Sequence, residues 1–587
     1  MFKIGIGSIV MPGLVAALGV GTVALGQDAP IPPPMPIRAV PAPPAPNPPD
    51  GPLDAPDLAS APTAAPVAPA VAPAPTAASP PATPPARSNP ALRYGDDQPV
   101  RRFLSLFWRD MFTYGGDDEF QFDGPPVLMI VPPIASSAPP NASKIPRPIR
   151  PPYYYDNDFR YLDDPNNKVV DAFDFLKRVR LDRAGRVKVD FGGEYRVRVI
   201  DYANQRLNGV NQDLTLDRMI AYSDLWIDDT LRVFIQGIDA QSAPQKTEPP
   251  LLTDINRWDL LDAFGELKFY KHEKDYASFR FGREELYFGN QRFVSNSIWV
   301  NSPRTFDDVA RLLYRSKNWD FDAFWSRPNQ IRPLLFDRPV YGQTFMGLYS
   351  VYKGFKYQTI DNYFLDLVNT AHVVPGRNGT LGGYTIPTLG TRWQGDYKGW
   401  LWEVEDAYQF GKQADMNRSA WSLTNGVGRR ESTWWGTPEL WFYCDYASGN
   451  KHPGGSTYST FNQLFPWGHK YLGFLDLVGR QNIIDLNVNL SIKPTSRLRF
   501  LAWYHHFMLD SATDALYNAA GLPTRIDPTG RSGRNVGDEI DFMLDFLLSP
   551  HNDFQIGYST FSPGGFIEHT GVGSGASFIY GMYTFRF

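Results

Sequence analysis

Cysteine is almost absent from this sequence, since Cys444 is the only one in 587 residues. A single cysteine can form neither a disulfide within the chain nor a cysteine-based metal site. Long apolar runs are lacking as well: after the first 26 residues, no stretch has the about 20 apolar residues that a membrane-spanning helix needs. The formal net charge is only −5, so no overall basic surface favours nucleic acid as a partner. These absences argue against a small disulfide-linked fold, a helical membrane protein and a nucleic-acid-binding protein.

Candidate catalytic groups are also scarce. His505 and His506 are adjacent in a predicted strand, so their side chains point to opposite faces and at most one can enter a lumen. Asp445 and Ser448 could form a catalytic pair, but a turn that ends a strand explains them better. His, Asp and Glu residues do not cluster with metal-ligand spacing. We therefore predict that the protein is not an enzyme, with no catalytic residue, no metal site and no cofactor.

What the chain does have is aromatic residues in alternation with polar ones. Aromatic side chains make up 14% of the sequence, yet the mean hydropathy is −0.33. In the last segment Ile579, Tyr583 and Phe585 fall on one face of a strand, whereas Arg586 falls on the other. Residues 187–199 alternate in the same way, with their charges on one face. A half-buried strand of a soluble sheet is the alternative for any one segment, but the repetition favours a membrane barrel.

About eighteen such segments can be counted, and long and short connections alternate between them. The predicted strands are residues 187–199, 213–227, 231–240, 259–270, 276–284, 305–314, 319–326, 341–352, 356–367, 383–395, 400–411, 417–428, 434–447, 481–492, 497–509, 537–548, 553–562 and 576–587. Longer loops are expected at 241–258, 285–304, 327–340, 368–382, 448–480, 510–536 and 563–575. The pattern predicts an all-β fold, a transmembrane antiparallel β-barrel of about 18 strands over residues 185–587. A barrel of this size leaves a water-filled lumen unless something fills it.

The chain before the barrel falls into three parts. Residues 1–26 read as a secretory signal peptide, with a retained membrane anchor as the alternative. Residues 27–92 are mostly proline and alanine, which predicts a disordered, extended linker. Residues 93–184 are expected to be a mostly irregular periplasmic segment. Together these features predict a protein of the outer membrane of a diderm bacterium, in contact with lipid and with both termini in the periplasm.

The densest polar stretch, residues 281–311, carries a resemblance to a known family. It reads Gly282-Arg-x-Glu-Leu-x-x-Gly-x-x-Arg292, followed by Trp299-x-Asn-x-x-Arg-x-Phe-Asp307. A second block agrees, at 445–450, 460–473, 479–482 and 514–517, as do residues 159–165 and 175–177. In these stretches the chain resembles the alginate export family of outer-membrane barrels. The resemblance covers residues 155–587.

The resemblance implies a channel for an anionic, alginate-like polysaccharide or oligosaccharide, whose carboxylates pair with lumen arginines. Arginine suits this role because its planar fork can bind a carboxylate through two parallel hydrogen bonds. By strand phase, or by their place on or beside the connection 285–304, the candidate lumen residues are Arg196, Arg198, Arg280, Arg283, Arg292, Arg304 and Arg311.

Other interpretations stay open for the same residues. Arg283 could be neutralised by Glu284 or Glu285, and Arg304 by Asp307, simply to hold the loop against the wall. The alternative functions are a general or small-solute porin, or a structural surface protein with a blocked lumen. An exporter would in addition need a periplasmic scaffold and an inner-membrane polysaccharide synthase as partners.

Overall fold

The computed structural model describes residues 153–164, 171–244, 250–377 and 379–587. The signal peptide, the Pro/Ala-rich linker and the predicted segment up to residue 152 therefore lie outside the described residues. None of the helices among the described residues is long and apolar enough to cross a membrane.

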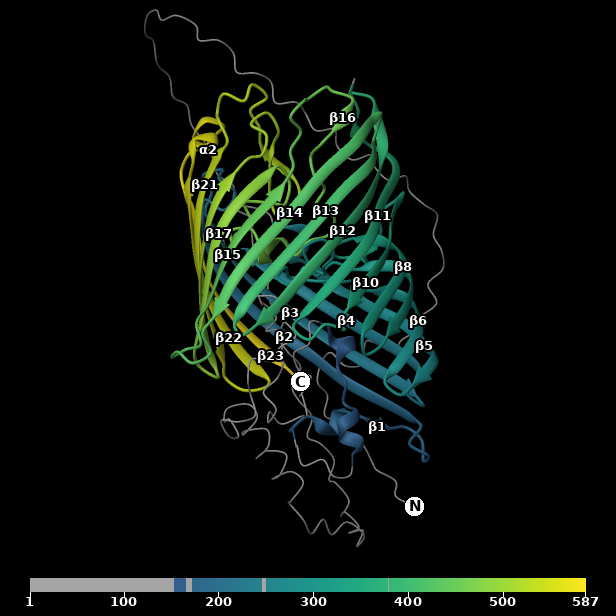
Figure 1. Cartoon of the computed structure of the whole chain (residues 1–587). Coiled ribbons are helices and arrows are strands. Elements are labelled where there is room, and N and C mark those ends of the chain that lie inside the picture. Colours follow the sequence, from purple (N-terminus) through teal and green to yellow (C-terminus); the bar gives the residue numbers. More distant parts are fainter. Residues whose placement is uncertain (1–152, 165–170, 245–249, 378) are drawn as a thin grey trace, which may run out of the picture. The chain divides into compact units, whose positions relative to one another are not determined.

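Within the described residues, eighteen antiparallel strands form a closed barrel (Figure 1). In sequence order they are β2 (Val187–Ala203), β3 (Gln212–Ile227), β4 (Leu231–Pro244), β5 (Asn256–His272), β6 (Asp275–Glu284), β7 (Phe306–Arg315), β8 (Trp319–Gln330), β10 (Gln343–Tyr352), β11 (Gln358–Pro375), β12 (Leu381–Tyr397), β13 (Trp400–Gln413), β14 (Met416–Arg430), β15 (Glu439–Ala447), β17 (Ile483–Thr495), β18 (Leu498–Met508), β21 (Asn535–Leu547), β22 (Asn552–Pro563) and β23 (Ala576–Arg586). The barrel closes where β2 pairs with β23, with Tyr195 opposite Phe585. The predicted barrel of about 18 strands is confirmed.

Short elements lie before the barrel and in its connections. They are η1 (Tyr154–Asp156), η2 (Arg160–Asp163), η3 (Asp174–Leu176), η4 (Leu252–Asp254), η5 (Gly468–Lys470), α2 (Gly565–His569), β1 (Val179–Arg180), β9 (Arg338–Pro339), β16 (Thr457–Tyr458), β19 (Leu516–Tyr517) and β20 (Pro523–Arg525).

The wall strands form because their side chains alternate between lipid and interior. In β2, Val199 is 56% exposed on the outer face, whereas Glu194 is 1% exposed inside the barrel. In β23, Ile579 is 51% exposed and Tyr580 is 2% exposed. An apolar outer face and a polar inner face are what a barrel in a bilayer requires. The core of this protein therefore lies inside the barrel, among polar and aromatic side chains.

The two ends of the barrel differ in their connections. At the short-turn end, strands are joined by residues 228–230, 273–274, 316–318, 353–357, 398–399, 431–438, 496–497 and 548–551. At the long-loop end they are joined by residues 204–211, 245–255, 285–305, 331–342, 376–380, 414–415, 448–482, 509–534 and 564–575. The predicted loop 368–382 is wrong: β11 continues to Pro375, and Val374 pairs with Gly382 beyond a bulge. The β-branched residues in 368–375 favour extended backbone, which explains the longer hairpin.

Glycines on the inner face make room for neighbouring aromatic rings. A Cβ at Gly390 would collide with the ring of Tyr363, and a Cβ at Gly557 would collide with that of Tyr580. Tyr363 and Tyr580 are 4% and 2% exposed. The large rings thus fold over small residues of adjacent strands and fix the strand register.

Candidate functional site

A long connection folds into the lumen instead of standing outside it. The inward loop, residues 285–305 between β6 and β7, buries Phe288, Phe293 and Trp299, which are 7%, 4% and 4% exposed. Its first residue is fixed where the Glu285 backbone N–H donates to Asp262 Oδ1 at 2.8 Å. The loop that carries the sequence resemblance therefore lies inside the barrel.

A second loop, residues 448–482 between β15 and β17, meets the inward loop inside the lumen. Val294 and Phe465 form a parallel bridge between the two loops. The Ser295 N–H donates to the Phe465 carbonyl at 2.7 Å, and the Phe465 N–H donates to the Phe293 carbonyl at 2.9 Å. The two loops thus fill the lumen together, as one hydrogen-bonded unit.

All seven arginines predicted for the lumen lie in the interior. Five are buried, and Arg283 and Arg304 are half-buried. They differ, however, in their partners. Four are paired with carboxylates, and three donate to backbone carbonyls.

At the base of the inward loop, Arg280 and Arg311 share one carboxylate. Glu284 Oε1 accepts from Arg280 Nη1 and from Arg311 Nη1, each at 2.5 Å. Arg280 Nη2 lies 2.9 Å from Glu266 Oε2, and Arg311 Nη2 lies 2.8 Å from Asp322 Oδ1. These ion pairs connect four neighbouring strands, β5 to β8, and leave little free charge.

Arg283 is also neutralised, but not by the carboxylates that follow it in sequence. Its Nε donates to Asp307 Oδ1 at 2.6 Å, and its Nη1 lies 3.3 Å from Asp259 Oδ1. Because Asp307 is occupied in this way, the predicted pairing of Asp307 with Arg304 does not form.

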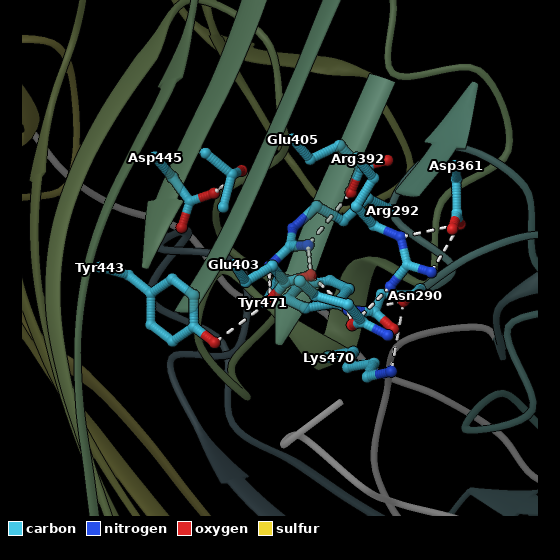
Figure 2. Close-up of polar contacts among 12 residues, drawn as sticks. Asn290, Arg292, Asp361, Arg392, Glu403, Glu405, Tyr443, Asp445, Lys470 and Tyr471 are labelled. Carbon is cyan, nitrogen blue, oxygen red and sulfur yellow. Dashed lines mark hydrogen bonds and ion pairs between the residues drawn. The ribbon is translucent and has the colours of Figure 1, made fainter. Parts of the chain in front are cut away.

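Arg292 lies at the centre of the polar network in Figure 2. Its Nη2 donates to Glu403 Oε2 and its Nη1 to Glu405 Oε2, both at 3.1 Å. Lys470 of the second loop donates to the Asn290 carbonyl at 3.2 Å beside this pair. Burial, with a smaller effect of the neighbouring Arg292, lowers the pKa of Lys470 to about 7. The network fastens the inward loop to β13 and the second loop to the inward loop.

Sequence reasoning did not single out several other interior arginines. Figure 2 shows Arg392, whose Nε donates to Asp361 Oδ2 at 3.0 Å. The Tyr349 hydroxyl donates to the same oxygen at 2.6 Å. Further interior arginines are Arg218, Arg418, Arg480 and Arg586. Strand phase, the signal that placed Arg196 and Arg198, could have found Arg218, Arg392, Arg418 and Arg586 as well.

Two arginines of β2 hold the tip of the inward loop. Arg196 Nη1 donates to the Ile298 carbonyl and its Nη2 to the Val300 carbonyl, both at 2.9 Å. Arg198 Nη1 donates to the Trp299 carbonyl at 2.9 Å, and its guanidinium lies 3.8 Å from the centre of the Trp299 ring. The tip therefore binds these two arginines through neutral carbonyl groups and the face of an aromatic ring.

Arg304 resembles these two arginines. Its Nη1 donates to the Ser295 carbonyl at 2.9 Å, and burial lowers its pKa to about 10. Among the described residues, no carboxylate forms an ion pair with Arg196, Arg198 or Arg304. We refer to these three as the carbonyl-bound arginines.

A cavity of about 500 Å³ opens beside the loop tip, towards the long-loop end. Arg198, Trp299 and Arg304 line it, together with Tyr202 and His469. Small-molecule sites in proteins have volumes of about 300 to 1,000 Å³. The cavity thus combines the size of a ligand site with two of the carbonyl-bound arginines.

The sequence model of the family described as alginate export matches residues 187–579, which is almost the whole barrel. The chain belongs to the alginate export family. The resemblance seen in the sequence is thereby confirmed. As a member of this family the protein is an outer-membrane channel and not an enzyme. No curated protein sequence matches the chain.

Solved structures from Pseudomonas aeruginosa are similar to this member of the alginate export family. OccD3 (OpdP) has 12% identity and a TM-score of 0.43, with 68% of this chain and 91% of that chain covered. OccK2 (OpdF), solved in complex with glucuronate, has 9% identity and a TM-score of 0.46, with 68% and 97% covered. The outer membrane protein opdK has 9% identity and a TM-score of 0.46, with 68% and 98% covered.

The stretch that carries the sequence resemblance, residues 282–307, corresponds to the inward loop and its anchors. Asn301 illustrates this, because its Nδ2 donates to the carbonyls of Asp217, Gln241 and Asp254 at 2.9, 2.9 and 3.0 Å. These acceptors come from β3, β4 and η4. The motif residues thus hold a loop within the channel.

Proposed function

We propose that this channel conducts an acidic, alginate-like polysaccharide or its oligosaccharides across the outer membrane. The observation that carries the proposal is the group of carbonyl-bound arginines, two of which, Arg198 and Arg304, line the cavity. A buried positive charge without a counter-ion is unfavourable, so an anion that reaches it is stabilised. The planar guanidinium of arginine can also donate two parallel hydrogen bonds to one carboxylate.

The loop contacts explain how an anionic sugar could replace the present partners. The tip of the inward loop gives Arg196 and Arg198 only carbonyl oxygens and a ring face. A hydrogen bond from arginine to a carboxylate is stronger than one to a neutral carbonyl. A uronate chain could therefore compete with the loop tip for these guanidinium groups.

Passage requires that the loops move, because the loops fill the lumen. The contacts between the inward loop and the second loop are backbone hydrogen bonds, among them the mutual pair at Phe465. Displacement of the inward loop would remove its tip from the β2 arginines. We therefore include gating by the inward loop in the proposed function.

The direction of the barrel is also part of the proposal. The C-terminal residue Phe587 exchanges backbone hydrogen bonds of 3.1 Å with Gly193 of β2 at the short-turn end. Short turns face the periplasm in barrels of this type. Both chain ends would then lie on the periplasmic side, where a scaffold and an inner-membrane synthase could deliver the polymer.

One observation favours a second function, a channel for small solutes without charge preference. Arg280, Arg283, Arg292 and Arg311 are all neutralised by carboxylates of the wall. A lumen balanced in this way would select weakly between anions and cations.

Single-channel recording of the full-length protein in a planar bilayer under a salt gradient distinguishes the two functions. The proposal expects anion-selective reversal potentials and block by polyuronate oligomers. The double variant Arg198→Gln/Arg304→Gln should lose much of both effects, whereas Arg429→Gln at the short-turn end should keep them. Open pores that lack selectivity and ignore polyuronates would refute polysaccharide passage and support the small-solute channel.

A further inference from the structure

Three consecutive tyrosines before the barrel are buried inside it. Tyr153, Tyr154 and Tyr155 are 1%, 8% and 3% exposed, and the short helix η1 begins at the second of them. Together with Asp156 they form a segment that we name the tyrosine latch, residues 153–156. This segment belongs to the chain that leads into the barrel and not to its wall.

The tyrosine latch is fastened to the inner wall. The Tyr154 hydroxyl donates to Glu194 Oε2 at 2.8 Å, and its ring stacks on Tyr222 with centroids 5.3 Å apart. Arg232 Nη2 donates to the Tyr155 carbonyl at 2.5 Å. These partners lie on β2, β3 and β4.

Three of these four residues, Tyr153, Tyr155 and Asp156, also hold the inward loop. The Tyr155 hydroxyl donates to the Glu285 carbonyl at 2.7 Å, and the Tyr287 hydroxyl donates to Asp156 Oδ2 at 2.7 Å. Tyr153 and Tyr287 stack with centroids 4.2 Å apart and planes 10° apart.

A further contact reaches deeper into the inward loop. The Asn296 N–H donates to the Tyr153 hydroxyl at 3.4 Å. Tyr153 thus contacts the loop at two points, since its ring also stacks on Tyr287.

This double attachment has a thermodynamic consequence. Because the tyrosine latch bonds the wall and the inward loop at once, release of the latch removes contacts that favour the inward position of the loop. Such coupling is reciprocal: a change that releases the loop must loosen the latch by the same factor.

We propose that the tyrosine latch locks the inward loop in its closed position, and that withdrawal of the latch towards the short-turn end frees the loop. The inference rests on the proposed gating function. A partner that draws the latch away from the wall would favour the open channel, without touching the loop itself.

The test measures loop release directly, so its outcome does not depend on what the channel conducts. The full-length protein carries Cys444→Ser and Val294→Cys, and the rate of reaction with a water-soluble maleimide is recorded in liposomes. Val294 is 1% exposed, so the closed loop protects it. The latch variant Tyr153→Ala/Tyr155→Phe should react about tenfold faster or more, a factor typical of coupled sites.

The matched control is Tyr357→Ala/Tyr397→Phe. These tyrosines are 45% and 44% exposed and contact each other edge to face at 5.0 Å, away from the latch. This pair should leave the maleimide rate unchanged. Intact barrels are verified in each variant by the heat-dependent shift in electrophoretic mobility.

Because the coupling is reciprocal, a second experiment measures release of the latch in a variant with a loosened inward loop. A cysteine at Asn157→Cys, in the Cys444→Ser background, reports on the latch. The loop variant Arg292→Met should accelerate its modification. Faster reaction in both arms supports the latch, whereas an unchanged rate in either arm, in a folded barrel, overturns it. Failure of polyuronates to block the channel would refute the proposed substrate and leave both rates unaffected.

Discussion

Replacement of Arg292 by methionine should open the channel. The Arg292 side chain is 1% exposed, and its partners Glu403 and Glu405 are 0% and 4% exposed. Methionine has a similar length but no charge, so the variant leaves two buried carboxylates without their cation. Removal of one partner from a buried ion pair costs about 3–5 kcal/mol.

This energy can be converted into a change in gating. Since 1.36 kcal/mol corresponds to a factor of ten, the ratio of the loop held in the lumen to a loop wholly withdrawn from it should fall by roughly two to three and a half powers of ten. Part of the cost disappears when both acids are neutralised as well. The triple variant Arg292→Met/Glu403→Gln/Glu405→Gln should therefore close again, at least in part.

The assay is the open probability of single full-length channels in a planar bilayer. The control is Arg429→Met, because Arg429 pairs with Glu431 at an exposed site, with side chains 38% and 30% exposed. An exposed pair contributes about 0–1 kcal/mol, so this variant should gate like the parent protein. An unchanged open probability in folded Arg292→Met barrels would refute the role assigned to the Arg292 network.

Two further predictions concern the second loop and the wall. Burial lowers the pKa of Lys470 from 10.5 to about 7. Docking of the second loop should therefore strengthen as the pH rises from 7 towards 10.5, because above pH 7 the docked side chain is neutral and no charge is buried. Open probability should fall as the pH rises from about 7 towards 10.5, and Lys470→Met should remove this dependence; a parent channel without pH dependence would contradict the assignment. Gly390→Ala should destabilise the barrel by about 1–3 kcal/mol because the new Cβ collides with Tyr363, whereas Gly581→Ala, with no atom near its Cβ, should be neutral. Urea unfolding midpoints of the two glycine variants decide this point, and equal midpoints would show that the ring is free to move.

The wall could be predicted from the sequence because a strand has only two faces. Once residues 187–199 are assigned to a strand, the period of two places Arg196 and Arg198 together on one side. The apolar outer face then decides which side is the interior. No knowledge of distant contacts is needed for this step, and the structure agrees at both positions.

The partners of the loop arginines could not be predicted in the same way. Arg292 binds Glu403, which lies 111 residues further along the chain. Arg304 binds a backbone carbonyl. Every residue has such a group, so the sequence does not show which one accepts the hydrogen bond. The sequence suggested nearby acidic residues as the ion-pair partners of Arg283 and Arg304. Before the fold is known, only charges that are close in the sequence can be expected to lie close in space.

The placement of the charges also limits how the gate can move. If the whole inward loop left the lumen, Arg292 would leave with it, and Glu403 and Glu405 would remain on the wall as two uncompensated acids. Such a lumen would repel an anionic polymer. If only the tip moved, Arg292 would keep its partners, and Arg196 and Arg198 of β2 would be exposed without a carboxylate of their own. Passage of a polyanion is therefore compatible with a loop that bends between Arg292 and its tip. Complete withdrawal, the state that Arg292→Met favours, would instead give an open channel that repels polyanions.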